Sequence, residues 1–141
     1  MTYLQWCKQH AQKHKILLEK LINLTDEQLI AYFDYDNMRQ LEPDFCPLYA
    51  ENTKCHAMKK LNCFLCACPH FRFDDDGIKK MRDKTLFSTC IISAKNSKVF
   101  VSEKALHQDC SNCFLPHTTG FIKKHFCRDW HAIMQKVSPY M

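Results

Sequence analysis

Residues 55–68 read CHAMKKLNCFLCAC and residues 109–117 read DCSNCFLPH, and each stretch contains one C-x-x-C pair. The pairs are Cys63 with Cys66 and Cys110 with Cys113. Two such pairs are typical of a four-thiolate zinc site, because the turn between the cysteines directs two sulfur atoms at one tetrahedral ion. The pairs are separated by 43 residues (67–109), more than in common zinc ribbons. The metal is therefore predicted to connect two distant segments, as a structural ion does.

Other thiols and one imidazole lie close to these pairs. Cys68 follows the first pair after one residue, Cys46 and Cys55 precede it, and His117 follows the second pair. The predicted metal ligands are Cys46, Cys55, Cys63, Cys66, Cys68, Cys110, Cys113 and His117. Eight ligands suffice for two tetrahedral zinc ions, so we expect one or two ions, and the pairing of ligands stays open. A purely thiol-rich core is the alternative.

The remaining cysteines and histidines have simpler interpretations. Cys7 falls on a predicted apolar helix face and is expected in the core. Cys90 falls in a predicted strand, where a core position is favoured over a ligand or a reactive thiol. The histidines on predicted helices are interpreted as surface or packing residues: His10, His14, His125 and His131. Three more lie close to the cysteines along the chain, and their roles stay open: His56, His70 and His107.

Ten cysteines among 141 residues indicate either a disulfide framework or a metal site. The first residues, MTYLQWCKQHAQKHK, lack the apolar run of a secretory signal. No apolar stretch reaches the roughly 18–20 residues that cross a bilayer. We therefore expect a cytoplasmic protein with reduced thiols and no membrane association, in which clustered cysteines bind metal or carry out redox chemistry.

The net charge of +5 is unevenly distributed. Residues 1–24 carry +3, residues 25–44 carry −5 and residues 45–141 carry +7. A basic metal-binding region suits nucleic acid or another anionic partner, although a solvated surface is the simpler interpretation. Phenylalanines near the cysteines could stack on bases, but a core role is favoured for them: Phe64, Phe71, Phe73 and Phe114.

The predicted fold class is α+β. Apolar residues spaced three and four apart predict a helix over about residues 2–23, and Thr25 with Gln28 forms a capping box that begins a second helix. This helical pair defines an N-terminal extension, residues 1–42. Its apolar stripe is expected to pack on the metal core. Only two glycines occur, which also favours helices over a turn-rich β fold.

Residues 43–141 are predicted to form the cysteine-rich metal-binding domain. Asp74–Gly77 predicts a turn, followed by a short helix through residues 79–81. The β-branched stretches 85–93 and 98–102 predict a short hairpin around Asn96 and Ser97. Apolar residues from Ile122 to Val137 predict one amphipathic C-terminal helix over residues 120–137.

The stretch NCFLCACPHF (62–71), with Lys54, Cys55 and His56 before it and DCSNCFLPH after it, resembles a known family. It is similar to the bacterial and archaeal cysteine-rich small domain proteins over about residues 43–118. The resemblance implies a zinc-finger-like, metal-binding domain with an N-terminal helical extension. It implies no particular reaction.

Several functions fit these patterns. A zinc-stabilised binding module for nucleic acid or protein is favoured. An iron–sulfur or thiol redox protein is the main alternative, although C-x2-C-x-C differs from the ferredoxin spacing and no βαβ context suits a thioredoxin motif. A soft-metal store or chaperone also suits surplus thiolates. An enzyme with catalytic zinc is less favoured, because no H-E-x-x-H or deaminase signature is present.

Overall fold

The computed structural model describes all 141 residues and confirms a mixed α+β fold. The helices are α1 (Tyr3–Lys20), α2 (Asp26–Tyr32), α3 (Tyr35–Leu41), α4 (Thr119–His125) and α5 (Trp130–Met134), with 3-10 turns η1 (Pro47–Tyr49) and η2 (Leu115–His117). The strands are β1 (Phe71–Phe73), β2 (Lys79–Met81), β3 (Lys84–Leu86), β4 (Ser88–Cys90), β5 (Lys98–Val101) and β6 (Ala105–Asp109). None of the helices has the length and apolar character needed to cross a membrane.

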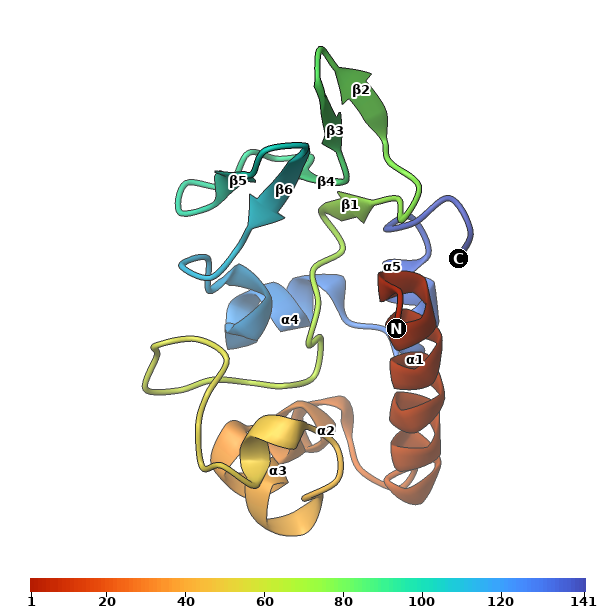
Figure 1. The fold of residues 1–141 in the computed structure, drawn as a ribbon. Helices are drawn as coiled ribbons and strands as arrows, with labels where there is room; N and C mark the ends of the chain where they lie inside the picture. Colours follow the sequence, from red (N-terminus) through yellow and green to blue (C-terminus); the bar gives the residue numbers. More distant parts are fainter.

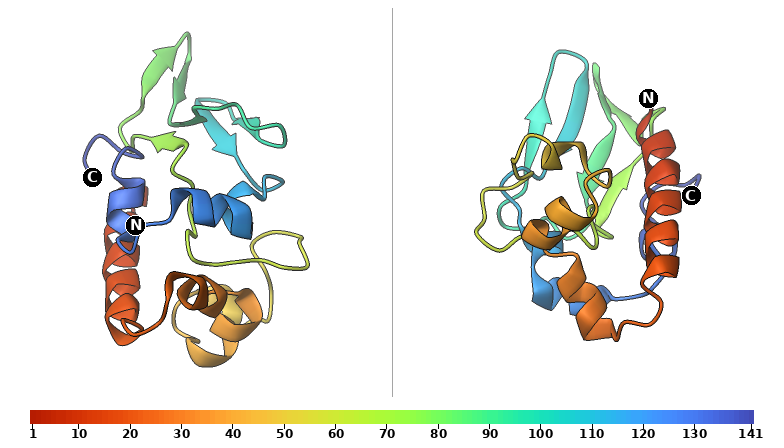
Figure 2. Two further views of the ribbon diagram at one scale, coloured as in Figure 1. Left: turned by 180° about the vertical axis from the view of Figure 1, so that it is seen from behind. Right: turned by 90° about the horizontal axis from the view of Figure 1, so that it is seen from below.

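The strands gather at one end of the molecule and α2 and α3 at the other, with α4 between them and α1 alongside (Figure 1). The view from behind shows the same arrangement (Figure 2). The segment that connects α3 to β1, residues 42–70, runs from the helical end to the strand end and carries five of the predicted ligands. Since the second C-x-x-C pair directly follows β6, the fold returns it toward this connecting segment.

The N-terminal helices begin where the sequence predicts. Thr25 accepts a hydrogen bond from the Gln28 amide at 3.2 Å, and the Gln28 side chain accepts one from the Thr25 amide at 3.0 Å. This capping box satisfies two amides that the first turn of α2 leaves unpaired. A reciprocal pair between Thr2 and Gln5 begins α1 in the same way. The helix α3, in the acidic segment, was not predicted.

The predicted helix at residues 79–81 is wrong. These residues form β2, which pairs antiparallel with β3 so that Met81 lies opposite Lys84. The pairing leaves a two-residue turn in which Arg82 has a φ of 60°. A positive φ at this position matches the twist that a two-residue hairpin requires. The hairpin partner, rather than the local helix propensity of the lysines, therefore decides this segment.

The predicted hairpin around Asn96 and Ser97 is also wrong. Residues 85–93 divide into β3 and β4, which belong to different sheets, and β5 pairs instead with β6. The four-stranded sheet has the order β2-β3-β6-β5, with β3 and β6 parallel, and β4 pairs with β1. The β-branched residues indicate strands correctly, but strand propensity carries no information about which strand is the partner.

The predicted C-terminal helix over residues 120–137 is interrupted. The helix α4 ends where Phe126 adopts an extended conformation with a ψ of 129°. Asp129 then begins α5 by accepting a hydrogen bond from the Ala132 amide at 3.3 Å. An N-cap aspartate of this kind stabilises a new helix start, so the chain changes direction between the two helices.

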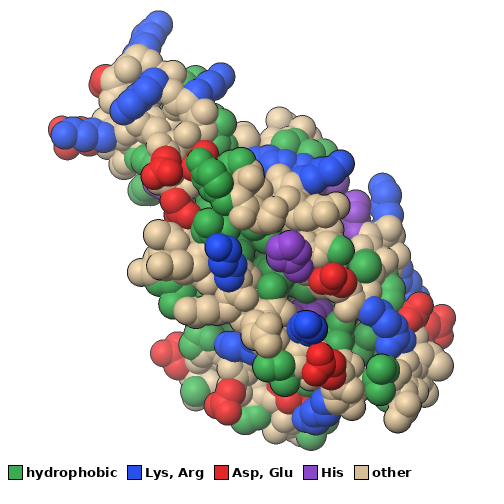
Figure 3. Space-filling view, turned by 90° about the vertical axis from the view of Figure 1, so that its right-hand side faces the viewer, with side chains coloured by type: hydrophobic (Ala, Val, Ile, Leu, Met, Phe, Trp, Pro, Cys, Tyr) green, Lys and Arg blue, Asp and Glu red, His purple; other side chains and the backbone are tan.

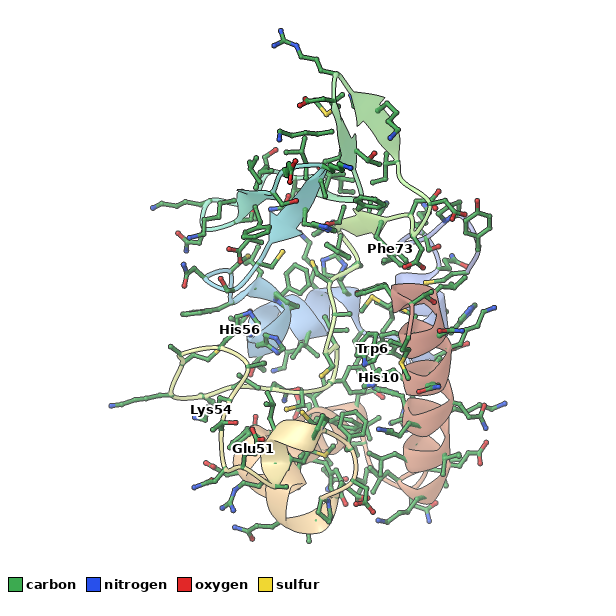
Figure 4. The ribbon with its side chains drawn as sticks, in the orientation of Figure 1. Trp6, His10, Glu51, Lys54, His56 and Phe73 are labelled. Atoms are coloured by element: carbon green, nitrogen blue, oxygen red, sulfur yellow. The ribbon has the colours of Figure 1, made fainter.

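One cluster of 19 buried side chains extends from α1 to α5. Trp6 and His10 of α1 pack against Trp130 of α5, with ring centroids 6.2 Å and 4.8 Å apart. Trp130 also donates a hydrogen bond from its indole to the carbonyl of Leu65, between Cys63 and Cys66. Figure 4 shows Trp6 and His10 on the side of α1 that faces the interior. The apolar stripe of α1 therefore packs on the segment that carries the first cysteine pair.

Several expected core residues are buried. Cys7 is 1% exposed, and Phe64 and Phe73 are buried as well, as the core interpretation predicted. Phe71 and Phe114 are half-buried. Of the two predicted alternatives, surface or packing, the structure shows packing for His10 and His14, because both rings lie inside the aromatic core.

Candidate metal centre

Cys55, His56 and His117 bring their ligand atoms within 4.8 Å of one another. They form the only group of three or more Cys, His or acidic side chains that meets at this distance. Cys55 and His56 lie on the loop after η1, and His117 ends η2. Two segments more than 60 residues apart in the sequence thus meet at one point, with an imidazole and a thiol facing each other.

His117 is held in an orientation suited to metal binding. Its Nδ1 lies 3.0 Å from the carbonyl oxygen of Asn62 and donates to it, and the Asn62 amide donates to the His117 carbonyl at 3.1 Å. A hydrogen bond from one ring nitrogen to a carbonyl fixes the tautomer and leaves the other nitrogen free to bind a metal. That free nitrogen, Nε2, lies 3.7 Å from Cys55 Sγ.

The separation of Nε2 and Sγ fits a shared zinc ion. Zinc–sulfur and zinc–nitrogen distances of about 2.3 and 2.1 Å at a tetrahedral angle place the two ligand atoms about 3.6 Å apart. At 3.7 Å, Cys55 Sγ and His117 Nε2 lie close to this spacing.

His56 is a third member of this group. Its Nδ1 lies 3.1 Å from Cys55 Sγ, and its Nε2 donates to the carbonyl oxygen of Cys110 at 3.0 Å. His56, labelled in Figure 4, therefore joins the first ligand segment to the second C-x-x-C pair through its hydrogen bond to Cys110. The sequence left the role of His56 open, and its position directly after Cys55 was the available signal.

The first cysteine pair lies near two further thiols of the same region, Cys46 and Cys55. Burial raises the pKa of Cys63 to about 12, and the Tyr49 hydroxyl beside it acts in the opposite direction. Burial also raises the pKa of Cys66 well above its ordinary value, and the neighbouring charges of Cys63, Cys46 and Cys55 act in the same direction. The structure thus places four predicted ligands, Cys46, Cys55, Cys63 and Cys66, within electrostatic reach of one another.

The second cysteine pair has different neighbours. Burial raises the pKa of Cys110 to about 11, and the charges of Cys113, Cys68 and Cys90 act in the same direction. Burial also raises the pKa of Cys68, and Cys90 and Cys113 contribute in the same direction. Cys68 therefore lies near the second pair, although it follows the first pair in the sequence.

A cavity of about 340 Å³ joins the two regions. Its lining includes six thiols and two imidazoles: Cys55, Cys66, Cys68, Cys90, Cys110, Cys113, His56 and His117. Six of the eight predicted ligands thus share one cavity, and Cys46 and Cys63 are not among its lining residues. Cys90 is the thiol in this cavity that the predicted ligand set omitted, because its strand pattern suggested a core position.

The burial of these thiols disfavours nucleophilic chemistry. Reactive cysteines have a pKa below the ordinary value, next to positive charge or at helix N-termini. Burial instead raises the pKa of Cys55, Cys66 and Cys68. Neutral thiols of this kind lose their protons when a metal ion binds, so metal binding is expected to weaken as the pH falls.

The other candidates lie apart from this cavity or outside any ligand group. His70 packs against the rings of Phe121 and His125, and His107 stacks on Phe87. Cys127 is exposed after α4. No match is found when the chain is compared with protein-family models, with curated proteins and with solved structures.

Proposed function

We propose that this protein is a zinc-binding module whose Cys/His sites are structural. The observation that carries the proposal is the 3.7 Å approach of Cys55 Sγ to His117 Nε2, with the opposite ring nitrogen hydrogen-bonded to a backbone carbonyl. Mixed thiolate and imidazole ligands are characteristic of zinc. The surplus of cysteine over carboxylate near the cavity suits closed sites in which the protein supplies all four ligands.

The resemblance to the cysteine-rich small domain proteins implies the same ligand class and belongs to this proposal. A cytoplasmic location belongs to it too, because reduced thiols are required for metal binding. An iron–sulfur or thiol redox protein is the alternative, and a soft-metal store or chaperone is a second one. Both use thiolates, so the identity of the bound metal separates them from a zinc module.

Protein purified anaerobically without a metal-affinity tag is expected to be colourless and to contain one or two zinc ions per chain. Elemental analysis with visible absorption spectroscopy measures both properties. Brown protein containing iron and acid-labile sulfide would establish the iron–sulfur alternative. Protein with no stoichiometric metal after anaerobic purification, and none after zinc reconstitution, would refute metal binding altogether.

The partner that we propose is nucleic acid, because of where the positive charge lies. Residues 78–104 contain seven lysines and arginines and two acids, so this segment alone accounts for the net charge of +5. The basic residues include Lys79, Lys80 and Arg82, all exposed on the β2–β3 hairpin. Figure 3 shows Lys and Arg side chains on the projecting upper end of the molecule. Phe100 of β5, 57% exposed, adds a ring on which a base could stack.

Reversing the charge of the hairpin is expected to weaken nucleic-acid binding by at least about tenfold. The variant is Lys79→Glu, Lys80→Glu and Arg82→Glu combined. Fluorescence anisotropy with a labelled oligonucleotide over a salt series measures affinity, and each lost phosphate contact lowers the log–log salt slope by about 0.7–0.9. The matched control, Lys8→Glu, Lys15→Glu and Lys136→Glu, changes the net charge equally on other exposed positions. Equal weakening by both variants would contradict a hairpin interface. If this chain instead selectively bound another protein and no oligonucleotide, a protein would replace nucleic acid as the proposed partner.

A further inference from the structure

We infer that Cys68, Cys90, Cys110 and Cys113 form a second zinc site, separate from the site that contains Cys55 and His117. The inference rests on the proposed zinc binding and adds to it the division of the ligands and a new ligand, Cys90. The first ion then binds Cys55 and His117 and takes its other two ligands from Cys46, Cys63, Cys66 and His56.

The two-stranded sheet brings Cys68 and Cys90 to the same end. Cys90 ends β4 and lies opposite Phe71, the first residue of β1. The chain before β1 turns back, since the Phe71 amide donates to the Cys68 carbonyl at 3.0 Å. The Ile91 amide donates to the His70 carbonyl at 3.0 Å and extends the pairing by one step. Cys68 and Cys90 therefore lie at adjoining ends of the two strands.

Two side chains fix the second C-x-x-C pair beside this end. The Cys90 amide donates to the Gln108 side-chain oxygen at 3.0 Å, and the Gln108 amide donates to the Ser88 hydroxyl at 2.8 Å. These bonds attach β4 to the last residues of β6. Cys110 follows directly, and the Cys113 amide donates to the Cys110 carbonyl at 3.0 Å. This short turn places both thiols of the pair on the cavity.

The neighbouring thiols Cys66 and Cys68 belong to different sets. Cys66 has a φ of 47°, a conformation that a residue other than glycine rarely adopts, and it changes the direction of the chain before Cys68. The thiols near Cys66 are Cys63, Cys46 and Cys55, whereas those near Cys68 are Cys90, Cys113 and Cys110. The C-x-C sequence is therefore the point at which the chain passes from one site to the other.

All four thiols of the second site line the cavity, and no three of their sulfur atoms lie within 4.8 Å of one another. A cysteine side chain reorients by rotation about a single bond, χ1, between staggered positions. An ion of charge +2 supplies the attraction that brings four thiolates together, and four thiolates complete a closed structural site. Without Cys90 this set has three ligands.

Cys90→Ser tests the inference through the number of bound ions. Native mass spectrometry and elemental analysis of zinc-loaded protein are expected to give two ions for the wild type and one for Cys90→Ser. Cys55→Ser is expected to lose the other ion, and the double variant both. The control Cys127→Ser, at an exposed thiol outside the cavity, is expected to keep two.

A second variant serves if Cys90→Ser does not fold. Cys90→His retains a ligand atom and is expected to keep two ions, with fewer thiolate-to-metal charge-transfer bands after cobalt substitution. Two ions with an unchanged cobalt spectrum in both Cys90 variants would overturn the second site while leaving zinc binding intact. A wild type with one ion would do the same. A wild type that binds no metal would refute the proposed function itself.

Discussion

Cys66→Ser and Cys113→Ser are each expected to lower the free energy of unfolding by more than about 4 kcal/mol, and chelation of the metal is expected to unfold the cysteine-rich part of the chain. The proposed ligands lie on a connecting segment without a long helix or strand and on a turn after a five-residue strand. Elements this short bury too little surface to persist alone, so the energy of metal binding becomes energy of folding.

Thermal and denaturant unfolding, measured together with metal content, tests this expectation. Cys127→Ser replaces an exposed thiol and is expected to change stability by less than about 0.5 kcal/mol. Cys7→Ser replaces a buried thiol of the helical core and is expected to cost only a small packing term. Both controls should retain their metal. If Cys113→Ser kept its metal and its melting temperature, Cys113 would not be a ligand and the joining of the two segments would be wrong.

Acid is expected to destabilise the protein through its buried histidines. Burial lowers the pKa of His10 to about 3, with the charges of His14 and Lys13 acting in the same direction. Burial also lowers the pKa of His14 to about 4, partly opposed by its hydrogen bond to the Phe64 carbonyl. The unfolded chain takes up protons at a pKa near 6.5, whereas the folded rings stay neutral. Stability contributed by neutral His10 is therefore complete above pH 6.5 and is lost as the pH falls toward 3.

His10→Phe should remove much of this acid sensitivity. His10 stacks on Trp6, and its Nε2 is buried without a hydrogen-bond partner, so a phenyl ring takes its place without the loss of a bond from that nitrogen. At about 1.4 kcal/mol for each pKa unit, lowering the pH from 7 to 5 should cost the wild type about 2 kcal/mol more than this variant.

The measurement is the difference in unfolding free energy between wild type and variant at each pH. Release of metal in acid affects both proteins and cancels in that difference. His131→Gln, at an exposed histidine of α5, is the matched control and should keep the wild-type slope. Parallel pH profiles for wild type and His10→Phe would show that His10 is not held neutral by burial.

The local features of this protein could be predicted from its sequence. Thr25 and Gln28 form their capping box because both partners lie within one helical turn. The apolar spacing that contains Cys7 predicts a buried helix face for the same reason, since residues three and four apart share one side of a helix. These signals depend only on neighbours in the chain.

The tertiary structure alone decided the strand partners and the geometry of the site. Residues 98–101 pair with residues 105–109 rather than with 85–93, and the C-terminal helix breaks so that Trp130 can pack on α1. Cys55 meets His117 across 62 positions of sequence, and Cys90 reaches the cavity through hydrogen bonds to Gln108. The types of ligand follow from the sequence, because thiols and imidazoles are the donors that zinc prefers. Which donors meet depends on the path of the whole chain, because contacts between distant segments arise only when every element between them is packed.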